Sequence, residues 1–158
     1  MEITPILTSA AWAGFYASGA GMLFTVGLRY LAYVFVCGFA GRLARDLLMG
    51  ADLSQNWSTV LAAAVVALVG MTAMRRHPAP LVLLASSLLP LAAAVPIFNS
   101  IVGVMKVSAL KGEPLAAASV ALSANVAKFF TTTLAIAVGL AAGIVLFRLL
   151  GRSKEVEV

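Results

Sequence analysis

Long apolar runs, each closed by basic or polar positions, divide the chain into segments. The runs cover residues 5–28, 30–49, 57–75, 80–106 and 115–150, with approximate ends. A helix needs roughly 20 apolar residues to cross the hydrocarbon core of a membrane, and each run approaches or exceeds that length. The pattern therefore predicts an all-α integral membrane bundle of about five spans. They would form a single transmembrane domain at 1–150, followed by a polar tail at 151–158.

The second run reaches spanning length only if its helix continues through three charged residues. Arg42 and Asp46 are four positions apart, so they can pair on one helical face. A helix that ended near Gly41 would be too short to span alone. We therefore favour the longer helix, to about Met49.

The fourth run contains internal helix breakers. Between Pro78 and Met105 no residue is charged, yet Pro90 and Pro96 interrupt the run. Proline removes a backbone N–H and clashes with the carbonyl four residues earlier. Backbone groups freed at membrane depth are tolerated only inside protein or along a wet cavity, and such segments point to transporter binding regions. We predict a broken or kinked helix whose bend lines the path, with a purely structural kink as the alternative.

The last run lacks an internal proline but carries polar residues midway. Asn125, Lys128 and Thr132 follow i, i+3, i+7 spacing, which places them on one helical face. The run is either one long, tilted helix or a short amphipathic helix that leads into a span at about 129–150.

Composition supports the membrane interpretation. Hydrophobic residues make up 62% of the chain, charged residues make up 11%, and the mean hydropathy is +1.04. A soluble domain has about 25% charged residues. The net charge of +5 comes from basic residues scattered between apolar runs, which is no argument for nucleic acid binding. With one Cys and one His, zinc-type clusters are effectively excluded, and we expect no metal and no cofactor.

No catalytic constellation is recognisable, so we do not expect an enzyme. Ionisable groups inside a bilayer are expensive and suggest function by default. The candidate substrate-binding residues are Arg42, Arg45, Asn99, Ser100, Asn125 and Lys128, with the helix break at Pro90 and Pro96. A cationic cavity of this kind suits a carboxylate. In the alternative, Arg42 pairs with Asp46, Lys106 extends to the interface, and Lys128 marks a second interface.

Several short stretches occur in an order that resembles a known family, over about Ala17 to Leu150. The stretches are Gly21-Met-Leu-Phe-Thr-Val-Gly27 with Arg29, Cys37 to Gly41 with Arg45, Asn56-Trp57-Ser58-Thr59, Pro90 and Pro96 into Ile97 and Ser100, Val107-Ser108, and Glu113-Pro114-Leu115. This order resembles the membrane half of the threonine/serine exporter family, in the short form that occurs as a separate subunit. The family usually has a Pro-Gly pair where this chain has Pro96-Ile97.

The resemblance implies export of small organic acids or amino acids across the bacterial inner membrane. Family members include the smaller subunit of a bacterial succinate exporter, whose partner is a second membrane subunit with a cytosolic hydrolase-like domain. This chain would then be the membrane subunit of a two-component secondary exporter for a dicarboxylate such as succinate, or for threonine and serine. Homo-oligomerisation within the complex is compatible with this role. The alternatives are a structural or assembly subunit without substrate contact, and a small membrane enzyme.

The distribution of basic residues predicts the orientation. Cytoplasmic ends of membrane helices carry an excess of Lys and Arg. With the N-terminus outside and the C-terminus in the cytoplasm, the inner ends collect Arg29, Arg75, Arg76, Arg148, Arg152 and Lys154. The outer ends collect fewer basic residues, so this orientation is favoured.

Overall fold

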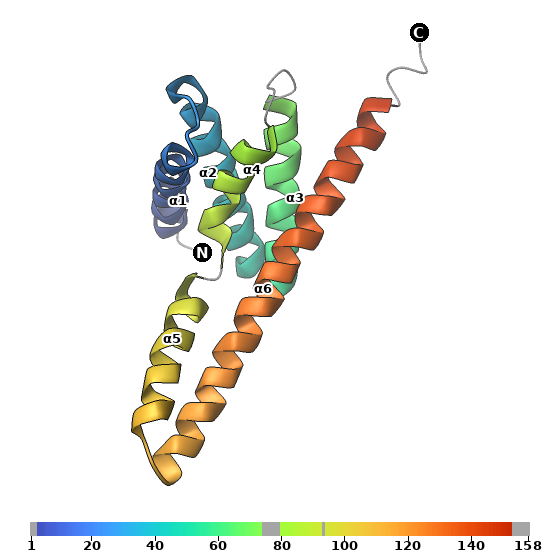
Figure 1. Cartoon of the computed structure of the whole chain (residues 1–158). Helices are drawn as coiled ribbons and strands as arrows, with labels where there is room; N and C mark the ends of the chain where they lie inside the picture. Colours follow the sequence, from blue (N-terminus) through green and yellow to red (C-terminus); the bar gives the residue numbers. More distant parts are fainter. Residues whose placement is uncertain (1–2, 74–79, 93, 153–158) are drawn as a thin grey trace. The chain divides into compact units, whose positions relative to one another are not determined.

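The computed structural model describes residues 3–73, 80–92 and 94–152, and these residues form helices and turns without any strand. The elements in chain order are α1 (Ile3–Leu23), α2 (Leu28–Gly50), α3 (Gln55–Ala73), α4 (Pro80–Leu88), the short 3-10 helix η1 (Leu89–Leu91), α5 (Ala94–Ala109) and α6 (Glu113–Arg152) (Figure 1). The predicted all-α class is confirmed. Of the expected tail, residues 153–158 lie outside the described part of the chain.

Length and composition support fewer spans than the five expected. In the described part of the chain, two helical stretches are long and apolar enough to cross a membrane: Gln55–Thr72 in α3 and Pro114–Leu150 in α6. A third is added if Val82–Leu91 and Val95–Ala109 are counted together. Helix α2 carries three charged side chains between Arg42 and Asp46, which lowers its hydropathy. The count of five remains a prediction.

The last apolar run forms one continuous helix of 40 residues. This result decides between the two alternatives for that run, because no break separates an amphipathic part from a span. At 1.5 Å per residue the helix is about 60 Å long, against about 30 Å for the hydrocarbon core. Helix α6 is therefore longer than a single crossing requires.

The fourth run is interrupted around Pro90. Helix α4 ends at Leu88, η1 contains Pro90, and α5 starts at Ala94. Pro96 lies in the first turn of α5, where a missing N–H leaves no helical hydrogen bond unmade. Asn99 and Ser100 consequently lie within α5 and not at the interruption.

The residues expected to form a single domain fall into two compact units. Unit 1 comprises Met1–Leu91 and Ala135–Val158, and unit 2 comprises Ala92–Leu134. In unit 1, helices α1 to α4 enclose a core whose largest fully buried side chains include Leu83, Leu84 and Leu91. Unit 2 is a helical hairpin of α5 and the first part of α6.

Small residues let the helices of unit 1 approach closely. A Cβ atom added to Gly38 of α2 would lie 2.6 Å from the Ala17 Cβ of α1. A Cβ added to Gly139 of α6 would lie 2.2 Å from the Val60 carbonyl oxygen of α3. Gly143 follows one turn later and packs against the same helix. This spacing of small residues is the usual device for close helix packing in membranes.

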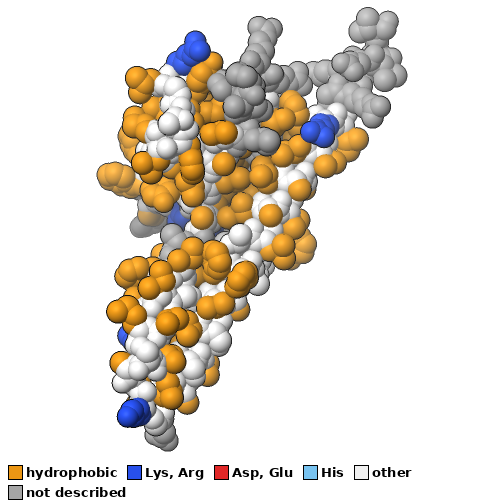
Figure 2. All heavy atoms as spheres, in the orientation of Figure 1, with side chains coloured by type: hydrophobic (Ala, Val, Ile, Leu, Met, Phe, Trp, Pro, Cys, Tyr) orange, Lys and Arg blue, Asp and Glu red, His pale blue; other side chains and the backbone are white. Residues whose placement is uncertain are grey.

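Large apolar side chains dominate the surface (Figure 2). On α1 and the start of α2, Trp12 is 72% exposed, Leu23 84% and Leu28 79%. Soluble proteins rarely expose contiguous apolar surface on this scale. The surface is suited to lipid or to other membrane helices.

Candidate functional site

A polar groove runs along the hairpin of unit 2. Its volume is about 310 Å³. The groove is lined by Asn99, Val102, Gly103, Lys106, Ala118, Ala121, Leu122 and Asn125. Each helix contributes residues at i, i+3, i+4 and i+7, which is the spacing of one helical face. The groove is therefore a feature of two regular helix faces and not of a loop.

The close approach of Gly103 and Leu122 sets the register of this groove. A Cβ on Gly103 would lie 3.1 Å from Leu122 Cδ1. Because the two helices run in opposite directions, Asn99 and Asn125 lie on the same side of that contact. Lys106 lies on the other side, opposite small alanine side chains. The groove thus has an amide end and a cationic end.

The polar groups of the groove retain unused hydrogen-bonding capacity. The Asn125 Nδ2 atom donates to the Ala121 carbonyl oxygen at 2.8 Å, which leaves its Oδ1 atom as an acceptor. Asn99 and Lys106 are exposed, and neither side chain has a hydrogen-bond partner within the described residues. The groove can therefore offer an ammonium group, an amide donor and an amide acceptor to one small molecule.

The other predicted residues of unit 2 do not line the groove. The Ser100 hydroxyl donates to the Pro96 carbonyl oxygen of its own helix at 2.7 Å. Asn125, Lys128 and Thr132 lie in the continuous helix α6 at the spacing of one face, but Lys128 is exposed and Thr132 is buried. Of the candidate residues in this unit, only Asn99 and Asn125 come together.

The two candidate arginines lie on α2 in unit 1. Arg42 Nε donates to Asp46 Oδ2 and to Ser9 Oγ, each at 3.0 Å. The Arg42–Asp46 pair is the alternative that the sequence offered, and the hydrogen bond to Ser9 connects α2 to α1. The Arg45 side chain is partly buried, and its Nε atom has no hydrogen-bond partner in the described part of the structure. Arg45 thus keeps a buried N–H donor without an acceptor among the described residues.

The Arg42–Asp46 pair allows a direct stability test. Because the two side chains are 33% and 17% exposed, their interaction is only partly screened by solvent. In a double-mutant cycle of Arg42→Gln and Asp46→Asn, we expect a coupling of about 0.5–1 kcal/mol. Unfolding by denaturing detergent measures this coupling. Additive effects of the two substitutions would show that the pair contributes nothing.

Sequence reasoning assigned Lys106 to the membrane interface and therefore did not include it in the site. The missed signal was its position seven residues after Asn99, which places both side chains on one face of α5. A lysine near a helix end usually extends to the interface, so this pattern alone was ambiguous. The small side chains on the facing part of α6 were not recognisable as partners.

No group of three or more His, Cys, Asp or Glu residues within the described ranges is arranged to hold a metal ion. The polar side chains of these ranges are cations, amides and hydroxyls, together with carboxylates such as Asp46 and Asp52.

The fold and the groove are those of a helical membrane protein with a polar groove on one hairpin. The family model described as "Threonine/Serine exporter, ThrE" matches residues 9–150. The chain belongs to the threonine/serine exporter family, as the resemblance in the sequence suggested. The family assigns it to exporter-type membrane transport. No solved structure matches this fold.

Proposed function

We propose that this chain is the membrane subunit of a two-component secondary exporter for small carboxylate metabolites. The observation that carries the proposal is the groove of the hairpin, which is lined by Asn99, Lys106 and Asn125 among small and apolar residues. Polar groups are costly in such surroundings, and they are found where substrates pass. The family membership supports the transport role.

The chemistry of the groove favours a carboxylate as the bound group. Among the described residues that line the groove, Lys106 is the only charged one, and none is an acid that would neutralise it. A charge-assisted hydrogen bond from its ammonium group is roughly twice as strong as a neutral one. The Asn99 amide supplies a second donor. Exposed Lys128, a turn beyond Asn125, would add to the attraction for anions.

The same groove suggests two substrates. A dicarboxylate such as succinate would use Lys106 for one carboxylate and Asn99 for the other. Threonine or serine would place its carboxylate on Lys106 and its ammonium group near the free Oδ1 acceptor of Asn125. The single positive charge favours the dicarboxylate, because a zwitterion gains less from it.

We further propose that the chain works in the bacterial inner membrane with a second membrane subunit that carries a cytosolic hydrolase-like domain. The N-terminus would be outside and the C-terminus in the cytoplasm. Exposed large side chains on α5, such as Phe98 at 66% and Met105 at 67%, offer apolar surface for lipid or that partner.

Reconstitution tests the proposed function. The chain and any membrane subunit that co-purifies from native membranes are placed in proteoliposomes preloaded with unlabelled succinate or threonine. Uptake of the labelled compound by exchange is expected only when the complex is present. Absence of exchange of either compound would contradict the exporter. If groove variants assemble with the partner and the complex still exchanges at the wild-type rate, the chain is an assembly subunit instead.

A further inference from the structure

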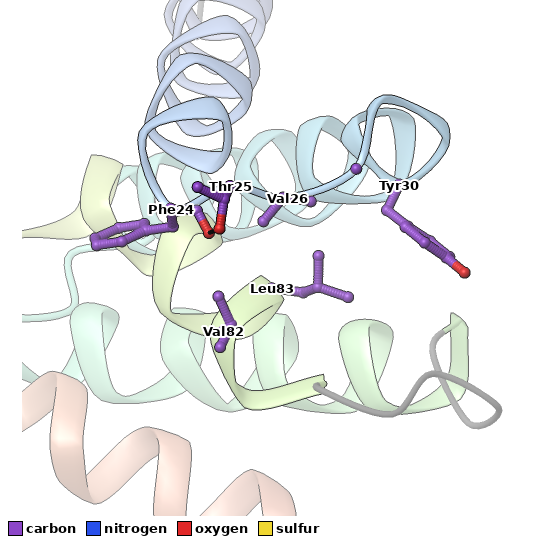
Figure 3. A pocket seen from close by; sticks show the side chains of 7 residues that line it. Phe24, Thr25, Val26, Tyr30, Val82 and Leu83 are labelled. Carbon is purple, nitrogen blue, oxygen red and sulfur yellow. Dashed lines mark hydrogen bonds between the residues drawn. The ribbon is translucent and has the colours of Figure 1, made fainter.

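Unit 1 contains a second pocket, at the end of the bundle where α1 turns into α2. Its volume is about 230 Å³. The lining residues come from the turn, the first part of α2 and the start of α4: Phe24, Thr25, Val26, Gly27, Tyr30, Val82 and Leu83. In Figure 3 the side chains of Thr25 and Val26 and those of Val82 and Leu83 come from the two sides of this pocket. The pocket lies wholly inside unit 1 and is separate from the groove.

The turn that lines the pocket holds an unfavourable backbone conformation. Thr25 has φ = 59°, in the left-handed region. For a β-branched residue this is a genuine outlier that costs about 1–3 kcal/mol. Two backbone hydrogen bonds fix the turn: the Val26 N–H donates to the Gly21 carbonyl oxygen at 2.9 Å, and the Thr25 N–H donates to the Met22 carbonyl oxygen at 3.0 Å. This pair of bonds is a Schellman cap that ends α1, with Thr25 at the position that glycine usually occupies.

Buried hydroxyl groups continue inward from the pocket along α4. Leu83 lines the pocket and is 1% exposed. The hydroxyls of Ser86 and Ser87, both 0% exposed, donate to the Leu83 carbonyl oxygen at 2.8 Å each. Residues three and four positions after Leu83 occupy the same helical face one turn deeper. The Leu83 side chain thus separates the pocket from a polar stretch of the core.

The buried thiol of Cys37 marks the inner end of this stretch. Cys37 is 0% exposed, belongs to the same core cluster as Leu83, and is in hydrogen-bond contact with the Ser87 side chain. Ser86, Ser87 and Cys37 thus form a short polar stretch in an apolar core.

We propose that this pocket is the entrance for the transported metabolite and that Leu83 is the gate to the hydroxyl-lined interior along α4. The inference rests on the proposed export function, since it identifies where the carboxylate enters. Arg29 lies beside the pocket, with its guanidinium carbon 4.9 Å from the centroid of the Tyr30 ring. A cation at the mouth raises the local concentration of anions. In the proposed orientation this end faces the cytoplasm, from which an exporter takes its substrate.

Cys37 provides the test, because it is the only cysteine in the chain. Inside-out vesicles that contain the intact complex are treated with a membrane-impermeant methanethiosulfonate, and the rate of Cys37 modification is measured by mass spectrometry. Wild-type protein should react slowly. Leu83→Ala should react about tenfold faster or more, because the shortened side chain favours the open gate.

Leu91→Ala is the matched control for Leu83→Ala. Leu91 is equally buried at 1%, but it faces Gly41 of α2 and does not line the pocket. Its truncation should leave the rate of Cys37 modification near the wild-type value. Equal rates of Cys37 modification in the two variants, or a wild-type rate in Leu83→Ala, would contradict the proposed gate.

A pocket-filling substitution keeps the proposal testable if the Leu83 variant does not fold. Val82→Trp occupies the pocket from a residue that is 43% exposed, and it should lower export about tenfold or more. Val36→Trp, at a residue 52% exposed outside the pocket, should export normally. Wild-type export by Val82→Trp would contradict the proposal that this pocket is the entrance for the metabolite.

The labelling experiment separates the gate from the export function. Labelling of Cys37 requires no substrate. If the complex exchanges no metabolite but the labelling rates are as expected, the export function is rejected and the gate at Leu83 is supported. If exchange is normal but Leu83→Ala and its control are labelled at equal rates, the gate is rejected and the export function is supported.

Discussion

Gly139→Leu is expected to prevent α6 from packing against α3 and to leave little folded protein in detergent. Even the first added atom, Cβ, would lie 2.2 Å from the Val60 carbonyl oxygen and 2.8 Å from the Ala63 Cβ. Both neighbours belong to a regular helix, so neither can move aside as a flexible side-chain end would. The two helices must separate, and we expect a loss of about 3 kcal/mol or more of stability. Unfolding by denaturing detergent and size-exclusion chromatography measure the loss.

Gly19→Leu is the matched control for this prediction. Gly19 lies within α1, and a Cβ placed there would have no atom within 4 Å. The same side chain should therefore be accommodated, and the stability should stay within about 0.5 kcal/mol of wild type. Equal losses for the two variants would show that the membrane helices resist a leucine anywhere. Stability unchanged by Gly139→Leu would contradict the observed contact between α3 and α6.

Lys106→Gln is expected to lower exchange of succinate about 10- to 100-fold, measured as kcat/KM. The factor corresponds to the loss of one charge-assisted hydrogen bond, about 1.5–3 kcal/mol. Gln keeps a donor and a similar length, so the loss reports the charge. Because the side chain is exposed and makes no hydrogen bond within the described part of α5, folding should be unaffected.

Lys111→Gln controls for net charge in the Lys106 experiment. Lys111 is exposed in the turn of the same hairpin and does not line the groove. The Lys111→Gln variant should exchange succinate at the wild-type rate. Loss of activity in both variants would indicate a general electrostatic effect of the hairpin. Wild-type activity in Lys106→Gln would remove the groove from the transport cycle.

The helices were largely predictable from the sequence because apolar runs closed by charged or turn residues leave few alternatives in a membrane protein. The interruption at Pro90 was expected from proline chemistry. Its extent was not predictable, because Pro96 is equally compatible with a break and with the first turn of a new helix. Only the structure places Asn99 inside α5.

The site was predictable in part, as single residues and not as a groove. Asn99 and Asn125 stood out because amides are unusual in apolar runs. Their meeting depends on the hairpin register, which the contact between Gly103 and Leu122 sets. Lys106 was assigned to the interface because its position seven residues after Asn99 gains meaning only with α6 in place. The left-handed conformation of Thr25 was not predictable, because glycine usually occupies that position of a helix C-cap.

Equilibrium binding of a carboxylate to the groove is the most direct test of the central claim. Isothermal titration calorimetry with succinate, and then with threonine, compares the purified wild-type complex with Lys106→Gln and Lys111→Gln. We predict equal Kd values for wild type and Lys111→Gln, and a Kd about tenfold higher or more for Lys106→Gln. An unchanged Kd in Lys106→Gln would contradict carboxylate binding in the Asn99–Lys106–Asn125 groove.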